Sequence, residues 1–66
     1  MASYYVNNNA QAKGDYEVHE WGCSYFPSDR TYLGEYSSCA GAVAKANETH
    51  SPANGCYWCC RACHTG

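Results

Sequence analysis

The stretch that decides the fold is Gly55-Cys56-Tyr57-Trp58-Cys59-Cys60-Arg61-Ala62-Cys63-His64. Four of the six cysteines of the chain lie in this segment, next to a histidine. Cysteine and histidine at such short spacings are the ligands of structural metal sites, and pairing into disulfides is their alternative role. We therefore expect this segment to tie the fold together.

The composition explains why the cysteines matter. A chain of 66 residues is near the lower size limit for folding on an apolar core, and this one has three valines, one leucine and no isoleucine. Its seven tyrosines and two tryptophans can form a small core, because each aromatic ring buries about 150–250 Å². Domains of this size usually need disulfides or a structural metal as well. We expect one small cysteine-rich domain over residues 1–66.

Three short segments favour β-strands. Residues 3–6 are rich in tyrosine and valine, residues 16–19 alternate between the two faces, and residues 31–36 form a third run. The asparagine and glycine residues between the first two segments are turn formers, which allows those segments to pair antiparallel. The sequence predicts a three-stranded, mostly antiparallel sheet.

One helix is expected after the third strand. Ser38 offers an N-cap, and the helix runs from about Cys39 to Thr49. Its inward face has the spacing of an amphipathic helix and consists of Cys39, Ala42, Val43 and Ala46. The sequence Ala-Asn-Gly at residues 53–55 is typical of a turn. The predicted class is α+β, a small three-stranded sheet with one helix and a C-terminal cysteine knuckle.

Two short pairs of metal-ligand residues point to a metal site. One pair lies at the end of the second strand and the other lies in the C-terminal segment. A structural zinc ion takes four such ligands in a tetrahedron, and an ion shared by both pairs would clip the sheet to the end of the chain. The expected cofactor is one structural zinc ion, bound by His19, Cys23, Cys56 and Cys59.

The remaining cysteines and histidines leave this ligand set open. Cys60, Cys63 and His64 are reserve metal ligands or disulfide partners, because the adjacent Cys59 and Cys60 can hardly both bind one tetrahedral ion. Cys39 lies on the inward face of the helix, where a cysteine usually acts as a small buried hydrophobe. We expect that role for Cys39 before a role as disulfide partner or ligand.

A resemblance supports the zinc hypothesis. Residues 16–23, Tyr-Glu-Val-His-Glu-Trp-Gly-Cys, look like the opening of small bacterial metal-binding modules similar to the N-terminal zinc domain of the Ada alkylation-repair protein. Such modules continue with a helix that has a serine near its start, here Ser38, and end in a G-x-x-C-x-x-C pattern, here residues 54–59. The resemblance implies a zinc-binding module without alkyl-transfer chemistry, which needs a larger protein.

The chain departs from the pattern of those modules where Cys60, Cys63 and His64 follow the last ligand and where Gly55 directly precedes Cys56. The whole chain also resembles a group of short uncharacterised bacterial proteins, which implies no activity.

Three other readings of the cysteines stay open. The main alternative is a disulfide-stapled small protein of exported or envelope context. Residues 60–64 match the C-x-x-C-H pattern of c-type haem attachment. A thiol redox pair at Cys56/Cys59 or Cys60/Cys63 would need a lowered thiol pKa, which Arg61 alone is placed to provide.

Charge and composition limit the kinds of partner that the sequence supports. The formal net charge is −2 and the four basic residues are scattered, so charge does not support nucleic-acid binding. No apolar stretch has the length of a membrane span. Residues 1–9 lack the basic start and apolar run of a signal peptide, so we expect a cytoplasmic location, where closely spaced cysteines more often bind metal.

No spacing of acidic or nucleophilic residues dictates a catalytic site, so we expect a binding or adaptor module and no enzyme. Its partner is not identified by the sequence, and a protein is the kind to test first. Trp21 and Trp58 are expected to be exposed contact residues, while Tyr25, Tyr32 and Tyr57 are expected to be core rings.

Overall fold

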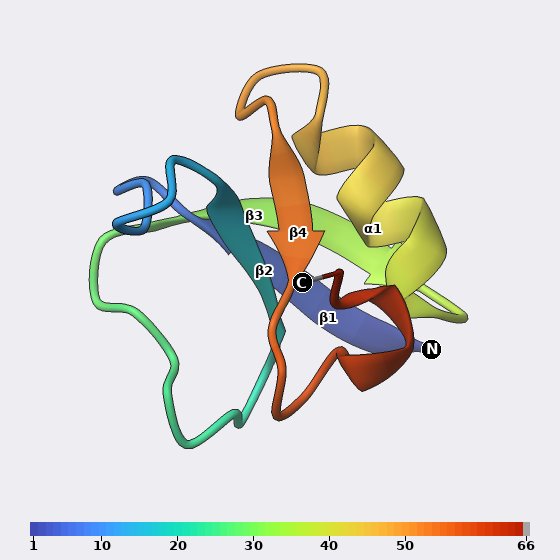
Figure 1. Ribbon diagram of the computed structural model, residues 1–66. Coiled ribbons are helices and arrows are strands. Elements are labelled where there is room, and N and C mark those ends of the chain that lie inside the picture. Colours follow the sequence, from blue (N-terminus) through green and yellow to red (C-terminus); the bar gives the residue numbers. More distant parts are fainter. Residues whose placement is uncertain (66) are drawn as a thin grey trace.

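The computed structural model describes residues 1–65 as a four-stranded mixed sheet with one helix packed on it (Figure 1). The strands are β1 (Ala2–Asn7), β2 (Tyr16–Glu20), β3 (Arg30–Tyr36) and β4 (Ala53–Gly55), in the spatial order β3-β1-β2-β4. The helix α1 spans Cys39–Ala46, and a short 3-10 turn, η1, spans Arg61–Cys63. The α+β class is confirmed, and the sheet has one strand more than predicted.

The centre of the sheet is β1, which pairs antiparallel with both β2 and β3. Val6 of β1 lies opposite Val18 of β2, and both side chains are fully buried. Tyr4 and Leu33 are also buried, against the small side chains of the helix. The predicted antiparallel pairing is therefore confirmed, and the valines form the middle of the core.

Residues 53–55 form a strand and not the predicted turn. They pair parallel with β2, so that Gly55 lies opposite Val18. The N–H of Cys56 then donates to the backbone oxygen of Val18 at 2.9 Å and extends the pairing by one residue. By their intrinsic preference asparagine and glycine form turns. The strand forms here because β2 provides hydrogen-bond partners for its backbone N–H and C=O groups.

The buried side chain of Asn54 is held by hydrogen bonds that the local sequence does not reveal. Its amide nitrogen donates to Asp15 Oδ2 at 2.8 Å and to the backbone oxygen of Thr65 at 3.0 Å. Its amide oxygen accepts the N–H of Thr65 at 2.9 Å. A polar residue can occupy a buried strand position when its donors and acceptors are all paired in this way.

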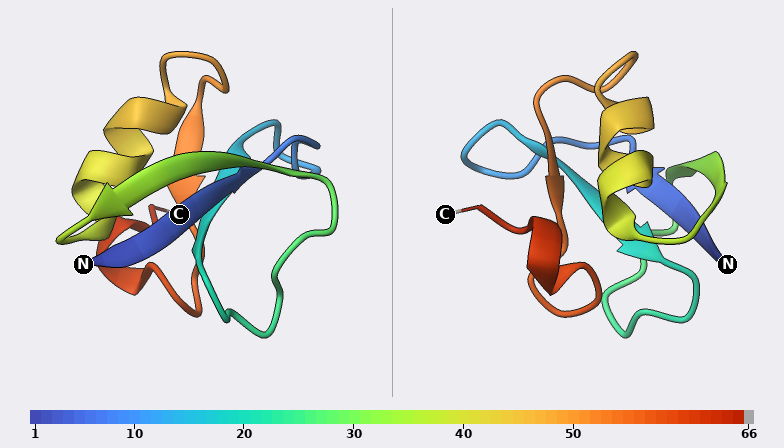
Figure 2. Two further views of the ribbon diagram at one scale, coloured as in Figure 1. Left: turned by 180° about the vertical axis from the view of Figure 1, so that it is seen from behind. Right: turned by 90° about the vertical axis from the view of Figure 1, so that its right-hand side faces the viewer.

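The helix α1 lies across the sheet and contacts all four strands (Figure 2). Three of its four predicted inward residues, Cys39, Ala42 and Ala46, are buried, and Val43 is partly buried. Their small side chains allow the helix to approach the sheet closely. The helix ends three residues before the predicted Thr49, and the chain continues in hydrogen-bonded turns.

Cys39 is joined to Cys63 by a disulfide, so the expectation of a simple buried thiol at Cys39 is wrong. Helix periodicity places Cys39 on the inward face but does not say which residue faces it. The bond connects the first residue of α1 to the last residue of η1. Disulfides persist mainly in oxidising compartments, so this bond argues against the expected cytoplasmic location. The cytoplasmic location stays a prediction from the sequence.

Removal of this disulfide should destabilise the fold without removing a metal ligand. The two cysteines are 24 residues apart in the sequence, and closing a loop of that length is worth about 3 kcal/mol in the chain-entropy model. We expect the double variant Cys39→Ala/Cys63→Ala to lose about that much unfolding free energy in denaturant titrations. It should still bind one zinc ion; loss of the metal would show that Cys39 or Cys63 serves the site directly.

The tyrosines are distributed differently from the prediction. Tyr25, Tyr32 and Tyr57 are 59%, 55% and 40% exposed, so the expectation of three core rings is wrong. The core tyrosine is Tyr4, which is 6% exposed. Tyr32 lies opposite Tyr5 on β1, whereas the buried Tyr4 and Val6 alternate with Tyr5 along that strand and point to the other face.

Within residues 1–65, no helix has the length and apolar character needed to cross a bilayer.

Candidate metal centre

The four predicted ligands meet at one end of the sheet. The ligand atoms of His19, Cys23, Cys56 and Cys59 all lie within 4.8 Å of one another. The Sγ atoms of Cys23 and Cys56 are 3.8 Å apart, and Cys59 Sγ is 3.9 Å from His19 Nδ1. Tetrahedral zinc, with bonds of about 2.3 Å to sulfur and about 2.0 Å to nitrogen, places its ligand atoms about 3.5–3.8 Å apart. The cluster has the dimensions of a metal site.

The parallel pairing of β2 with β4 brings the two halves of the site together. Val18 and Gly55 are paired in register, and His19 and Cys56 are the residues that directly follow them. Parallel strands end at the same edge of a sheet, so the first ligand of each half leaves that edge side by side. Figure 1 shows the segments after β2 and β4 running next to each other below the sheet.

A glycine turn returns Cys23 to the site. Gly22 has a φ of +90°, a left-handed conformation that glycine adopts at little cost. The turn is closed by a hydrogen bond from the N–H of Cys23 to the backbone oxygen of Glu20 at 3.2 Å. The Cys23 thiol thereby contacts the Cys56 thiol and is only partly exposed to solvent.

The second half of the site is a tight turn whose two ligand sulfurs accept hydrogen bonds from backbone N–H groups. The N–H of Cys60 donates to the oxygen of Cys56 at 2.9 Å and closes the turn. The N–H of Trp58 donates to Cys56 Sγ at 3.4 Å, and the N–H of Glu20 donates to Cys59 Sγ at 3.2 Å. Such donors favour the thiolate form of a sulfur ligand.

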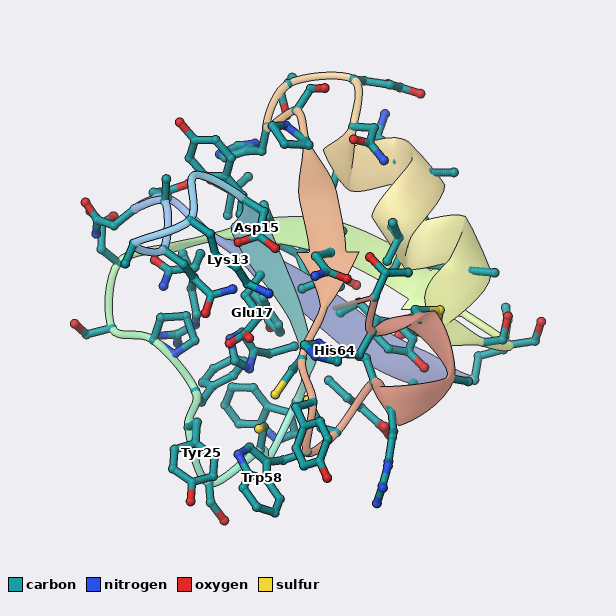
Figure 3. The ribbon with its side chains drawn as sticks, in the orientation of Figure 1. Lys13, Asp15, Glu17, Tyr25, Trp58 and His64 are labelled. Atoms are coloured by element: carbon teal, nitrogen blue, oxygen red, sulfur yellow. A yellow bond between two sulfur atoms is a disulfide. The ribbon has the colours of Figure 1, made fainter. Side chains whose placement is uncertain are left out.

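Glu17 orients the histidine, a role that the sequence analysis missed. Glu17 Oε1 lies 3.0 Å from His19 Nε2, while the other ring nitrogen, Nδ1, faces Cys59. A carboxylate on the outer nitrogen of a metal-binding histidine fixes the ring and its tautomer. The signal was present in the sequence, because residues two apart in a strand point to the same face. Figure 3 labels Glu17 on β2.

Removal of the Glu17 carboxylate should weaken metal binding while the fold is retained. Loss of a partner in the outer shell of a metal site typically costs about 10–100-fold in affinity, and we expect Glu17→Ala to fall in that range. Competition of the protein with a chelator of known affinity measures the change. The matched control is Glu35→Ala, since Glu35 is exposed on β3. Equal zinc affinity of the two variants would contradict the role of Glu17.

Burial favours the uncharged forms of the candidate ligands Cys56, Cys59 and His19 when no metal is bound. Burial raises the pKa of the Cys56 and Cys59 thiols and lowers the pKa of the His19 imidazole below its usual range. The thiols of metal-free Cys56 and Cys59 are therefore protonated at neutral pH. A reactive dithiol needs the opposite shift, so the direction of these pKa shifts does not favour the thiol redox reading of Cys56/Cys59.

Metal binding should consequently depend steeply on pH. A metal ion displaces the protons of Cys56 and Cys59, and each displaced proton changes the apparent affinity about tenfold per pH unit. The affinity for zinc should therefore rise about 100-fold or more between pH 6.5 and 7.5. Burial lowers the pKa of the His19 imidazole, so this ligand adds little to the proton release. Calorimetric titrations in buffers of different ionisation enthalpy count the protons, and release of fewer than two would refute this account.

The reserve ligands other than Cys60 have partners of their own. Cys63 is bonded to Cys39, so neither is a metal ligand in this structure. Cys63 is also the second cysteine of the C-x-x-C-H pattern, and its disulfide leaves no thiol for haem attachment or for a Cys60/Cys63 redox pair. His64 Nδ1 lies 3.0 Å from the backbone oxygen of Gly55. Cys60 Sγ lies 3.9 Å from Cys59 Sγ but outside the four-atom cluster.

The exposed tryptophans are both located inside the ligand-bearing loops. Trp21 is 62% exposed and lies between His19 and Cys23, while Trp58 is 65% exposed and precedes Cys59. The ring of Tyr25 stacks on that of Trp58, with centroids 5.6 Å apart (Figure 3). The predicted exposure of the tryptophans is confirmed, and an aromatic surface lies directly outside the metal site.

Comparisons with protein-family models, with curated proteins and with solved structures found no match to this chain. The similarity to the Ada zinc domain therefore stays a resemblance of ligand spacing. The interpretation of the site is carried by its geometry, which shows a small domain with a histidine and three cysteines placed to hold a metal ion.

Proposed function

We propose that this chain is a structural zinc module that binds a partner through the aromatic side chains around its metal site. The observation that carries the proposal is the convergence of one imidazole and three thiols within 4.8 Å of one another. Thiolate and imidazole ligands at tetrahedral spacing favour zinc among the common divalent ions. Four protein ligands close the coordination sphere, so the role of the metal is structural and the module is not an enzyme.

The metal would join two loops that lie far apart in the sequence. Residues 21–23 and residues 56–60 are loops outside the sheet, and the ion would link them to each other and to the end of β2. The loops also carry Trp21 and Trp58, which are both largely exposed. Zinc would therefore hold an apolar contact surface in place, as expected of a binding or adaptor module whose partner is a protein.

Cobalt substitution tests the metal site directly. We expect reduced, metal-free protein to take up one Co²⁺ ion and to show the intense visible bands of a tetrahedral ion with thiolate ligands. One equivalent of Zn²⁺ should displace it and bleach the bands, and native mass spectrometry should find one zinc ion per chain. The weak spectrum of octahedral Co²⁺, or a chain without stoichiometric metal, would refute the proposal.

Tryptophan fluorescence tests the connection between the metal and the aromatic surface. Trp21 and Trp58 are the two tryptophans of the chain, and both lie within two residues of a ligand. Removal of zinc should release the loops and shift the emission toward that of a fully hydrated indole. The control is the variant Cys23→Ser, whose emission should not respond to zinc. An unchanged spectrum of the wild type on chelation would show that the metal does not order these loops.

A further inference from the structure

The metal site leaves one thiol without a role. Cys39 and Cys63 form the disulfide, and Cys23, Cys56 and Cys59 belong to the ligand cluster. Cys60 is free and only 2% exposed. Its Sγ atom lies 3.9 Å from Cys59 Sγ, so the unused thiol is in contact with a ligand sulfur.

The two neighbouring sulfurs differ in accessibility and in chemical state. Cys59 is partly exposed, whereas Cys60 is buried. A sulfur bound to zinc is a thiolate, whatever the state of the metal-free thiol. Small oxidants from solvent therefore reach Cys59 before Cys60, and an oxidised Cys59 would have the Cys60 thiol 3.9 Å away as a sulfur that no metal holds.

We propose that Cys59 and Cys60 form an oxidation site, at which peroxide converts the metal-bound Cys59 and its neighbour Cys60 into a disulfide and releases the metal ion. The inference rests on the proposed zinc site and adds a means of regulating it. The oxidant is hydrogen peroxide or an organic hydroperoxide.

The reaction balances in two steps. The Cys59 thiolate attacks one peroxide oxygen, the O–O bond breaks, hydroxide leaves, and Cys59 becomes a sulfenic acid. The Cys60 sulfur then attacks the Cys59 sulfur, the S–O bond breaks, and the hydroxyl group leaves as water with the proton of Cys60. The two sulfurs together lose two electrons and the peroxide gains them. A metal ion held at the site would thereby lose the Cys59 ligand.

The disulfide formed in this way should be easy to reduce. Adjacent Cα atoms are about 3.8 Å apart across a trans peptide, whereas unstrained disulfides join Cα atoms about 4.4–6.8 Å apart. Strained disulfides are the labile and regulatory ones. A phosphine or thiol reductant should therefore restore both thiols and, with them, the metal site.

The test starts from zinc-loaded wild-type protein treated with hydrogen peroxide. A chromogenic chelator should record release of one zinc ion per chain. Alkylation and peptide mass mapping should find Cys59 and Cys60 protected in one peptide that is lighter by two hydrogens. Subsequent reduction with a phosphine and addition of zinc should restore full metal loading.

The variant Cys60→Ser is the matched comparison. Serine keeps a hydroxyl donor beside Cys59 but cannot form a disulfide. We expect this variant to bind one zinc ion with the affinity of the wild type. Peroxide should drive its Cys59 to the sulfinic acid, so that reduction restores little metal binding.

The outcomes separate this inference from the proposed function. A wild-type disulfide between Cys56 and Cys59, or between Cys23 and Cys56, would overturn the role of Cys60. Full recovery of the Cys60→Ser variant after peroxide would overturn it as well. In both cases the zinc site would stand. If reduced wild-type protein binds no zinc before peroxide is added, the proposed function fails and the inference fails with it.

Discussion

The variant Cys23→Ser is expected to lose high-affinity zinc binding together with most of the stability that zinc provides. Loss of an outer-shell partner costs about 10–100-fold in metal affinity, so loss of one of four ligands should cost more than 100-fold. Zinc present at about 1,000 times its dissociation constant stabilises a fold by about 4 kcal/mol. In a domain of this size, that stabilisation corresponds to about 15–30 °C in melting temperature.

Cys23 is the most informative ligand to replace, because it is only partly buried. Serine at this position leaves the apolar core intact, so the metal-free variant should melt within a few degrees of metal-free wild type. The difference should appear only when zinc is added. Cys60→Ser serves as the control, since it changes a buried thiol that lies outside the ligand cluster. A Cys23→Ser protein that zinc stabilises as much as the wild type would refute the ligand assignment.

The variant Gly55→Ala is expected to have the second large effect, and here the cause is steric. A Cβ atom at residue 55 would lie 2.6 Å from the backbone oxygen of Cys60 and 2.7 Å from the Cβ of Cys63. It would also lie 2.9 Å from the backbone carbonyl carbon of Cys63. Backbone atoms that belong to a disulfide-bonded turn cannot rotate away as the end of a flexible side chain can.

Overpacking of this kind costs about 1–3 kcal/mol and occasionally more, and we expect Gly55→Ala to lie at the upper end. Because η1 must move away from β4, the turn that contains Cys59 moves with it, so zinc affinity should fall as well. Gly14→Ala is the control: Gly14 has a φ of +92°, and a Cβ atom there meets nothing within 4 Å. That variant should lose about 1–2 kcal/mol through backbone strain and keep its zinc affinity. Denaturant unfolding and chelator competition measure both quantities, and a Gly55→Ala protein as stable as the wild type would contradict the close approach.

The cluster of four residues that could hold a metal ion was predictable because its signal is local. His19 and Cys23 are close in the sequence, as are Cys56 and Cys59, and in a chain with a poor core such short pairs favour a metal site over the other roles of cysteine. Whether the two pairs meet depends on the fold. The prediction required only that the end of the second strand should lie next to the C-terminal segment. The three predicted strands followed from tyrosine and valine content in the same local way.

The failures concern features that depend on a distant partner. Residues 53–55 form a strand because β2 lies beside them, and nothing within Ala-Asn-Gly records that neighbour. Cys39 has the spacing of a core residue, and its bond to Cys63 follows from where η1 lies. Glu17 is a different case, because its partner His19 is only two residues away and the contact follows from the alternation of side chains along β2.

The short parallel pair β2–β4 leaves the register of the last strand weakly determined by its own hydrogen bonds. A strand of three residues forms few hydrogen bonds, so its own ladder discriminates poorly between neighbouring alignments. A slip of one residue would turn the side chain of Cys56 to the opposite face of the sheet, because successive side chains alternate. Bound metal would tolerate no such slip, since Cys56 must face His19. In this small domain the ion would therefore fix the register of β4 against β2.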